Sequence, residues 1–572
     1  MNDTQFAIFR ASTAHGSGAG QRSLMPTFSS IVTERSDTMG TSEYDAIVIG
    51  SGFGGVMAAL PLVHAGRRVL MIERGDWVAR GPHNWTAEGV GLRTPHYSVE
   101  TPYRITSGRR HYVGGSFSCV GGASVFYGGA SIRFREQDFE ADPEIVGDSG
   151  AEWPFRYAEI EPFYSRAERI LHVAGAASGD PTEPYHSEPY PQAPGPISHV
   201  SRRIEHAARR LGFSPSRLPL AINYTEGARR ACSACGTCDG YACAIEAKND
   251  LASSVLPDLV RRGLEVRANT VVVRLVAEGG SITEVECVDR HTLEQSRVRA
   301  TDVLLAGGAL ATPHLLLASE LPRLNPGGHT VGRYLMRHRN GVVLGVFAGR
   351  PNARREFDKQ LAINDFYFGH ASISSPRGKL GNIQQITPPA GLVKAYLGLP
   401  MGPAAAVGVS LTTGMIVIAE DQPQLENGVD IDPSVRDRFG LPQLHVTHHY
   451  SARDIASCNA LVAKAKQILR AAGAWLYWVH SIDTFSHALG TVRMGNDPTT
   501  SALDADGRFR GIDNLYVVDA SAFPRSAGVN PSLTIAANAL RIGERLVART
   551  GGAHAVPSLA TRAPLPYIDV KE

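Results

Sequence analysis

Four closely spaced cysteines form the densest group of reactive side chains in this sequence. Cys232, Cys235, Cys238 and Cys243 follow the pattern C-x2-C-x2-C-x4-C in a chain that has seven cysteines. Thiolates at this spacing could hold an iron–sulfur cluster, because ferredoxins use a very similar run. Zinc is an alternative, although the ligands lie closer together than in its usual paired arrangement. A loop of buried thiols or one local disulfide is the third interpretation.

Three glycines near the start of the chain predict a binding site for an adenine dinucleotide. Gly50, Gly52 and Gly55 form the motif G-x-G-x-x-G. The first glycine permits a tight turn, the second lets the backbone approach a pyrophosphate, and the third lets a helix pack close to a strand. An incidental glycine-rich turn is the alternative, and the segments around the motif argue against it.

These flanking segments have the order strand, helix, strand. An apolar run at 46–49 precedes the glycines, a helix-like segment at 56–64 follows them, and a second apolar run at 69–72 ends in Glu73. The helix N-terminus would direct unpaired N–H groups at the phosphates. Glu73 would accept hydrogen bonds from a ribose 2′-hydroxyl. This context predicts a Rossmann-type unit.

A second glycine-rich segment, at 113–135, contains three Gly-Gly pairs among small residues. Such pairs let the backbone pass close to something flat or bulky, and a flavin lying along the backbone would account for them. A surface loop is the alternative. Phe126 and Tyr127 in the same segment indicate that the segment is packed inside the protein.

Together with several further motifs, these two segments resemble motifs of the glucose–methanol–choline oxidoreductase family, whose members are FAD enzymes acting on alcohols. The fold class that this resemblance implies is α/β: a Rossmann-type FAD-binding domain, interleaved with an α+β substrate domain built on an antiparallel sheet. The resemblance extends from about 44 to 550 and rests on the dinucleotide unit, the glycine segment and motifs at 153–157, 161–164, 309–319, 331–338, 427–432, 486–495, 515–519 and 528–534.

The chain is expected to cross between the two domains several times. We expect a disordered extension at 1–43, FAD-binding segments at 44–150, 226–325 and 481–550, substrate-domain segments at 151–225 and 326–480, and a tail at 551–572. The cysteine run falls in the second FAD-binding segment. Translation could start at Met1 or at Met39, where the composition becomes globular.

Oxidising an alcohol to a carbonyl requires an acceptor for the hydride and a base for the hydroxyl proton. Flavin N5 can take the hydride, and histidine suits the proton because it titrates near neutrality. The resemblance implies that His487 is this base and that Asn530 contacts the substrate oxygen or the flavin edge. The G-V-N-P motif around Asn530 is similar to the cholesterol-oxidase and dehydrogenase branches. Alternatively, His487 is a structural histidine of the core whose ring nitrogens are hydrogen-bonded within the protein.

The resemblance also implies which residues bind the FAD. Besides Gly50, Gly52, Gly55 and Glu73 they are Gly121, Gly122, Tyr127, Gly128, Val272, Asp519 and Asn530. Asp519 also suits an N-cap of the segment that follows it. Some relatives attach FAD covalently through a histidine in the glycine segment. Phe126 stands at the matching position here, so we expect non-covalent FAD.

The glycine segment and the cysteine run look most like bacterial oxidases of aminoglycoside or sugar hydroxyls. We therefore expect an aldehyde or ketone product from a sugar, an aminoglycoside or another polyol. A sterol or an aliphatic alcohol is the alternative substrate. A non-redox FAD-containing lyase on the same fold and a non-enzymatic flavin-binding protein are the alternative functions. The acceptor is expected to be O2, a quinone or an electron carrier, and a cluster would favour a carrier.

The composition and the charge of the chain bear on its partners and its location. The 572 residues carry a formal net charge of +2 without a long basic run, so a nucleic-acid partner is not expected. The stretch 400–419 carries no charge but contains Pro, Gly, Ser and Thr, and is expected to form strands of a buried sheet rather than a transmembrane segment. The N-terminus lacks a secretory pattern, and we expect a cytoplasmic protein.

Overall fold

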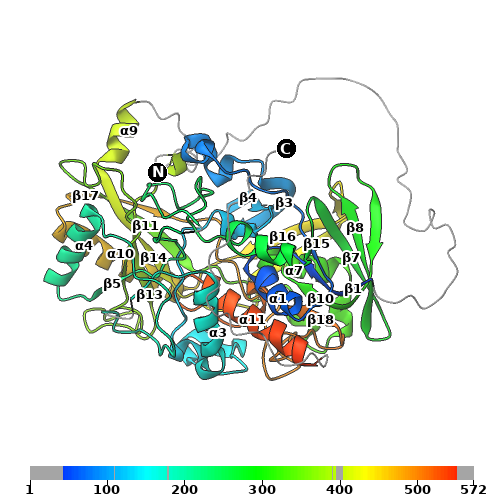
Figure 1. Cartoon of the computed structure of the whole chain (residues 1–572). Coiled ribbons are helices and arrows are strands. Elements are labelled where there is room, and N and C mark those ends of the chain that lie inside the picture. Colours follow the sequence, from blue (N-terminus) through cyan, green and yellow to red (C-terminus); the bar gives the residue numbers. More distant parts are fainter. Residues whose placement is uncertain are drawn as a thin grey trace, which may run out of the picture.

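The computed structural model describes residues 43–549, with the exception of 109, 177–178, 228, 390 and 394–402. The expected extension at 1–43 (apart from residue 43) and the expected tail at 551–572 therefore lie outside the described residues. The described part contains four β-sheets with helices packed against them (Figure 1).

The first sheet has five parallel strands in the order β18-β10-β1-β2-β6. Its strands are β1 (Tyr44–Ile49), β2 (Val69–Ile72), β6 (Glu265–Arg267), β10 (Ala300–Leu305) and β18 (Leu515–Val517). β1, β2 and β10 are short apolar runs whose side chains are mostly buried. This pattern is typical of a parallel sheet covered on both faces.

Helices cover this sheet. α1 (Phe53–His64) packs against α11 (Ser532–Arg549), which packs against α3 (Tyr157–Ile170), and the three lie next to one another in Figure 1. α7 (Gly308–Ala318) follows β10. Because β1 and β10 are parallel neighbours, the N-termini of α1 and α7 lie at the same edge of the sheet.

A three-stranded antiparallel sheet is inserted between β6 and β10, and α7 packs on its first strand. Its strands are β7 (Thr270–Glu278), β8 (Ser281–Asp289) and β9 (Gln295–Val298).

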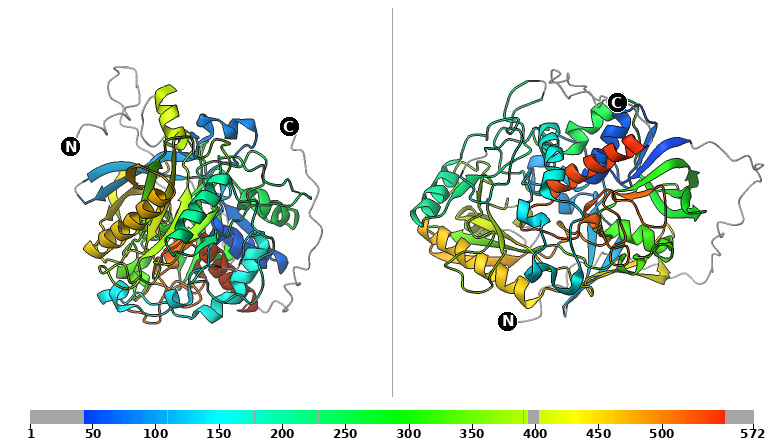
Figure 2. Two further views of the ribbon diagram at one scale, coloured as in Figure 1. Left: turned by 90° about the vertical axis from the view of Figure 1, so that its left-hand side faces the viewer. Right: turned by 90° about the horizontal axis from the view of Figure 1, so that it is seen from below.

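The largest sheet has six antiparallel strands in the order β17-β11-β14-β13-β12-β5 and lies beside the parallel sheet (Figure 1). Its strands are β5 (Pro215–Arg217), β11 (Arg339–Val346), β12 (Leu361–Ile363), β13 (Gly381–Ile386), β14 (Thr412–Ala419) and β17 (Leu476–Ser481). Helices α10 (Ala452–Ala471) and α4 (His199–Arg210) cover one face over an apolar layer. They lie in front of the sheet, in gold and teal, in the left view of Figure 2.

A four-stranded sheet has the order β15-β16-β3-β4, with β16 and β3 parallel and the other pairs antiparallel. Its strands are β3 (Tyr97–Ser107), β4 (Arg110–Phe117), β15 (Gly428–Arg436) and β16 (Pro442–His448). Short helices connect the sheets: α2 (Pro143–Val146), α5 (Leu251–Ser254), α6 (Leu256–Arg261) and α9 (Pro403–Ser410).

The expected α/β fold class is confirmed, but the expectation for 400–419 is wrong in part. β14 is a buried strand, whereas Pro403–Ser410 forms helix α9. Three consecutive alanines, the residue of highest helix propensity, lie in that run, and an apolar pattern alone does not distinguish a short helix from a strand. Within the part of the chain that the structure describes, every helix is too short or too polar to cross a bilayer.

Candidate active site

Gly50, Gly52 and Gly55 shape the connection between β1 and α1. A Cβ on Gly50 would lie 2.4 Å from the carbonyl oxygen of Ala306, and one on Gly55 would lie 2.0 Å from that of Gly50. Both glycines therefore permit close contact between backbones. A Cβ on Gly52 would meet nothing within 4 Å. Gly52 begins α1 without a side-chain cap, so the first helical turn opens onto free space suited to a phosphate.

Glu73 stands at the carboxyl end of β2, next to this turn. Its carboxylate accepts hydrogen bonds from the N–H groups of Ser51 (3.1 Å) and Gly75 (3.0 Å) and from the Ser51 hydroxyl (2.6 Å). Burial raises the pKa of Glu73, and these hydrogen bonds oppose the shift. A carboxylate offers about four acceptor positions, so capacity remains for a ribose hydroxyl.

The second glycine segment lies on the first. Gly121, at a left-handed φ of +91°, donates its N–H to the Ser51 hydroxyl (3.0 Å). A Cβ on Gly122 would lie 2.9 Å from the Cα of Gly52. The backbones of two segments some 70 residues apart are therefore in contact at the dinucleotide turn.

Tyr127 and Gly128 follow in the same segment. The Tyr127 ring packs edge-on against Phe53, with ring centroids 5.4 Å apart. A Cβ on Gly128 would lie 1.9 Å from the carboxylate of Asp239 and 2.7 Å from the ammonium group of Lys359. Gly128 thus lets the segment pass directly beside a charged pair.

Asp519 follows β18 and faces the N-terminus of α7. It accepts hydrogen bonds from the N–H of Gly308 (2.8 Å) and the hydroxyl of Thr312 (2.5 Å). It also accepts from the N–H (2.8 Å) and hydroxyl (2.5 Å) of Ser521 and caps a short 3-10 turn there. Its backbone borders the dinucleotide turn, because a Cβ on Gly54 would lie 3.0 Å from the Asp519 Cα.

These features fit a flavin dinucleotide. Open space lies before an uncapped helix N-terminus, a buried carboxylate ends the next strand, and a glycine segment lies across the turn. Val272 is buried in β7 opposite Cys287 and belongs to the main apolar core; its contact with the adenine stays a prediction.

His487 and Asn530 come from separate loops and meet at one point. The side-chain nitrogen of Asn530 lies 3.4 Å from Nε2 of His487, and the Asn530 oxygen accepts a hydrogen bond from the Gln384 amide (2.6 Å). Gln384 of β13 thereby turns the Asn530 nitrogen toward His487. Both His487 and Asn530 are partly exposed.

His338 lies on the other side of the His487 ring. The Nδ1 atoms of the two histidines are 3.2 Å apart, and the rings are nearly perpendicular, at 88°. Nε2 of His338 lies 3.0 Å from the carbonyl oxygens of both Ser526 and Ala527. His338 is fully buried.

The pKa of His487 is lowered well below its ordinary value of 6.5. Burial is the main cause, the electrostatic effects of His338 and Lys359 add to it, and Asp421 acts in the opposite direction. Only part of the ring is accessible, so most of its surroundings are protein rather than water. The imidazole is therefore neutral at physiological pH, which is the state that a proton acceptor needs.

Lys359 connects this site to the cysteine run. Its ammonium group lies 2.7 Å from the carboxylate of Asp239, and both side chains are largely buried. Asp239 directly follows Cys238 in the sequence. Because this ion pair lies against Gly128, the cysteine run borders the glycine segment.

All seven cysteines are free thiols. Cys238 lies in the main apolar core, and burial raises its pKa well above the ordinary value. Among the residues that the structure describes, no group of three or more His, Cys, Asp or Glu side chains is placed to hold a metal ion. The expectations of an iron–sulfur cluster or zinc at Cys232, Cys235, Cys238 and Cys243 are therefore not supported. The segment carries four free thiols, of which only Cys238 is buried.

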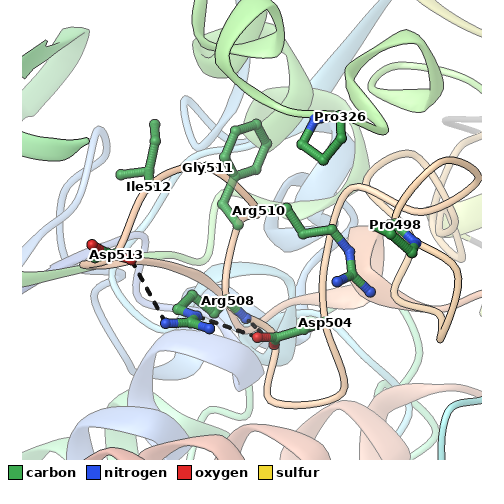
Figure 3. A pocket seen from close by; sticks show the side chains of 9 residues that line it. Pro326, Pro498, Asp504, Arg508, Arg510, Gly511, Ile512 and Asp513 are labelled. Carbon is green, nitrogen blue, oxygen red and sulfur yellow. Dashed lines mark hydrogen bonds and ion pairs between the residues drawn. The ribbon is translucent and has the colours of Figure 1, made fainter. Parts of the chain in front are cut away.

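A pocket of about 230 Å³ lies elsewhere, in the loops around 504–513, and contains none of the expected site residues. Arg508 pairs there with Asp504 (3.2 Å) and Asp513 (3.8 Å) (Figure 3). Arg510 donates to the carbonyl groups of Gly495 (2.7 Å) and Ser501 (3.2 Å). Both guanidinium groups of this pocket are thus engaged in holding the loops together.

The sequence analysis did not identify three of the residues around His487. His338 closes the motif at 331–338, to which no role was assigned. Gln384 is a polar residue in the buried strand β13, a pattern that indicates a polar partner. Lys359 has no distinguishing signal in the sequence.

The fold and this site define a flavin-dependent oxidoreductase of alcohols. Two models of the GMC oxidoreductase family match the chain, the N-terminal one at residues 44–340 and the C-terminal one at residues 423–539. The chain belongs to the GMC oxidoreductase family.

Characterised relatives cover nearly the whole chain. 6'''-Hydroxyparomomycin C oxidase of Streptomyces lividus is 31% identical over 547 residues, which cover 87% of this chain and 90% of the relative. Paromamine 6'-oxidase of Streptomyces fradiae is 31% identical over 532 residues, with coverage of 87% and 90%. The crystal structure of pyridoxine 4-oxidase from Mesorbium loti aligns with a TM-score of 0.63 at 19% identity and covers 88% of this chain and 98% of that one; it supports the fold alone.

Proposed function

We propose that this protein oxidises a CH–OH group of a small molecule to an aldehyde or ketone, with His487 as the base that takes the hydroxyl proton. One observation supports the proposal: an imidazole Nε2 and an amide N–H group lie side by side, on two side chains that are both partly exposed. FAD, when bound, supplies the acceptor for the hydride. Gly50, Gly52, Gly55, Glu73, Gly121, Gly122 and Asp519 would hold its dinucleotide part.

His487 and Asn530 suit the two needs of an alcohol oxygen. Nε2 of neutral His487 accepts the hydroxyl proton, while the Asn530 amide donates a hydrogen bond to the same oxygen. An amide is not a base at neutral pH, so His487 alone takes the proton. Gln384 keeps the Asn530 amide in the orientation that this requires.

A sugar, an aminoglycoside or another polyol is the proposed substrate. The names of two relatives at 31% identity refer to aminoglycoside oxidation. On the sheet face that carries Gln384, Asn340 and Asn382 both pair with Ile418 across the strands. The side-chain oxygens of Asn340, Asn382 and Gln384 are buried and lack a hydrogen-bond donor within the described structure. Hydroxyl and ammonium groups of a substrate would supply donors to such oxygens.

A sterol or an aliphatic alcohol is the second candidate, because the neighbouring rows of the same sheet face are apolar. Ile416 lies opposite Gln384 on one side and opposite Val342 on the other. Val342, Leu344, Ile386, Ile416 and Ile418 form one apolar cluster, packed by Ile482. An alcohol with a long apolar body would contact this cluster.

The direct test is to mix the FAD-loaded protein anaerobically with paromamine, glucose, cholesterol and 1-octanol and to record the flavin absorbance. We expect bleaching by paromamine and a product that mass spectrometry finds two hydrogen atoms lighter. Faster bleaching by cholesterol or 1-octanol would favour the second candidate. A lyase or a flavin-binding protein without activity would keep its flavin oxidised with every alcohol. Reoxidation by O2, a quinone or a carrier then identifies the acceptor.

We propose further that the FAD is held without a covalent bond. Phe126 stacks on Phe117, with ring centroids 4.6 Å apart, and is buried, and a phenyl ring cannot attack a flavin methyl group. Acid precipitation should release the flavin into the supernatant. Flavin retained in the protein pellet would contradict this assignment.

A further inference from the structure

We propose that His338 is a positioning residue that sets the tautomer of His487. It accepts the Nδ1–H of His487 and so leaves Nε2 without a hydrogen on the side that faces Asn530. The inference rests on the proposed role of His487 as the base, and it explains how this base is kept ready.

The partners of His338 fix the direction of the hydrogen bonds. Its Nε2 lies 3.0 Å from the carbonyl oxygens of Ser526 and Ala527. Carbonyl oxygens only accept, so Nε2 of His338 carries the hydrogen, and its Nδ1 is a lone pair in the neutral ring. This lone pair lies 3.2 Å from Nδ1 of His487. Nδ1 of His487 must therefore donate, and its Nε2 remains an acceptor.

Asn530 requires the same tautomer from the opposite side of the ring. Gln384 donates to the Asn530 oxygen at 2.6 Å, which leaves the Asn530 nitrogen, a donor, 3.4 Å from Nε2 of His487. A donor is accommodated there only by an unprotonated nitrogen. The two neighbours of His487 thus select one tautomer independently.

The backbone holds His338 in position. Its φ of +59° lies in the left-handed region, which is uncommon for residues other than glycine. Asp421 accepts from the N–H groups of His338 (3.1 Å) and Arg337 (2.8 Å), and the Tyr450 hydroxyl donates to the His338 carbonyl (2.9 Å). An unfavourable conformation retained at a buried histidine indicates that the ring position matters.

The arrangement has a consequence for proton transfer. When a substrate O–H bond breaks and the Nε2–H bond forms, Nε2 gives up its contact with the Asn530 N–H, while the charged His487 ring still donates from Nδ1 to His338. Without an acceptor at His338, only the weak 3.4 Å contact with Asn530 opposes the tautomer with hydrogen on Nε2, and that tautomer becomes populated. That tautomer presents a donor to the alcohol and cannot take its proton.

A matched pair of variants separates this role from a structural one. His338→Asn and His338→Leu both lose the Nε2–H donor to the two carbonyl groups, but only asparagine keeps an acceptor near the position of Nδ1. We expect His338→Leu to bleach its flavin at least about 100-fold more slowly than His338→Asn with the fastest alcohol of the panel, because the wrong tautomer removes most of the catalysis by a base. Equal rates in two variants with equal FAD content would overturn the proposal.

A spectroscopic measurement on the wild-type protein needs no substrate. Spectra of ¹⁵N-histidine-labelled protein, with the His487 signals assigned by their loss in His487→Gln, report which ring nitrogen carries the hydrogen. Hydrogen on Nδ1 supports the proposal, and hydrogen on Nε2 overturns it even if both His338 variants fail to fold. Absence of alcohol oxidation in the wild type would contradict the proposed function, while this tautomer measurement would still decide the role of His338.

Discussion

Nε2 of His487 lies 3.4 Å from the side-chain nitrogen of Asn530, so the base faces a neutral hydrogen-bond donor at this point. The donor requires an unprotonated Nε2, which is the state of a base, and the second N–H of the amide can hold the substrate oxygen while the proton leaves. It also adds no negative charge that would favour the imidazolium. The low pKa of His487 and the position of Asn530 therefore serve the same step.

Asn530→Asp should reverse this arrangement. A carboxylate beside Nε2 favours the charged ring, so the pKa of His487 should rise and the acid limb of kcat/KM should move to higher pH. The loss of the amide donor should lower kcat/KM on the order of 100-fold near neutrality. The pH dependence of flavin bleaching measures both effects. Asn496→Asp, at an exposed position, serves as the control, and an unchanged acid limb in Asn530→Asp would count against the assignment.

Lys359→Met should also move the acid limb to higher pH. The Lys359 charge lowers the pKa of His487, and its removal makes protonation of the ring less costly. The variant also leaves Asp239 without its partner, and this negative charge acts in the same direction. Lys464→Met changes the same residue type in α10, on the far side of the six-stranded sheet, and should leave the profile as in the wild type. A shift to lower pH in Lys359→Met would contradict the electrostatic account.

Gly52→Ala and Gly55→Ala should separate FAD binding from folding. A Cβ at position 52 meets nothing in the protein but occupies the space where the pyrophosphate is expected, so this variant should fold and bind FAD weakly. A Cβ at position 55 would lie 2.0 Å from a backbone oxygen, so that variant should lose stability itself, by a few kcal/mol. Flavin content and the unfolding temperature of the apoprotein distinguish the two. Full flavin content in Gly52→Ala would place the dinucleotide elsewhere.

His314→Gln should reduce the sensitivity of the protein to acid. His314 is buried in α7, its Nε2 lies 2.7 Å from the carbonyl of Pro442, and burial lowers its pKa from 6.5 to about 4. Between these pH values the unfolded chain binds a proton that the folded protein does not, so stability falls as the pH is lowered from 6.5 to about 4. The loss amounts to up to about 3 kcal/mol from this group. Urea unfolding at several pH values should show a smaller loss in His314→Gln, and equal losses would refute the assignment.

The short strands and helices of this fold can be predicted from the sequence. Where their observed bounds differ from the predicted ones, packing against other segments is the reason. β2 occupies the expected range, Val69–Ile72, because four apolar residues between a helix and a glycine turn have the length of a strand and are too few for a helix. α1 begins at Phe53 rather than 56. Its first turn contains Gly54 and Gly55, which are weak helix formers, but any larger residue would collide with the backbone of Val518 or Gly50.

In the site, too, the local motifs can be predicted from the sequence, whereas the contacts between distant segments cannot. Gly50, Gly52, Gly55 and Glu73 lie in one βαβ unit, so their spacing predicts their arrangement. The contacts of His487 with His338 and of Asn530 with Gln384 join residues 149 and 146 positions apart. No local pattern specifies such pairs, because they depend on how the six-stranded sheet is placed against the C-terminal loops.

The measurement that tests the central claim most directly is the rate of anaerobic flavin bleaching in His487→Gln, with His291→Gln, an exposed histidine, as the matched control. Loss of a general base should slow the reaction about 10²- to 10⁴-fold while the FAD content and the unfolding temperature stay close to those of the wild type. His291→Gln should react at the wild-type rate. Bleaching of His487→Gln within a few-fold of the wild type would show that another group takes the proton and would contradict the account.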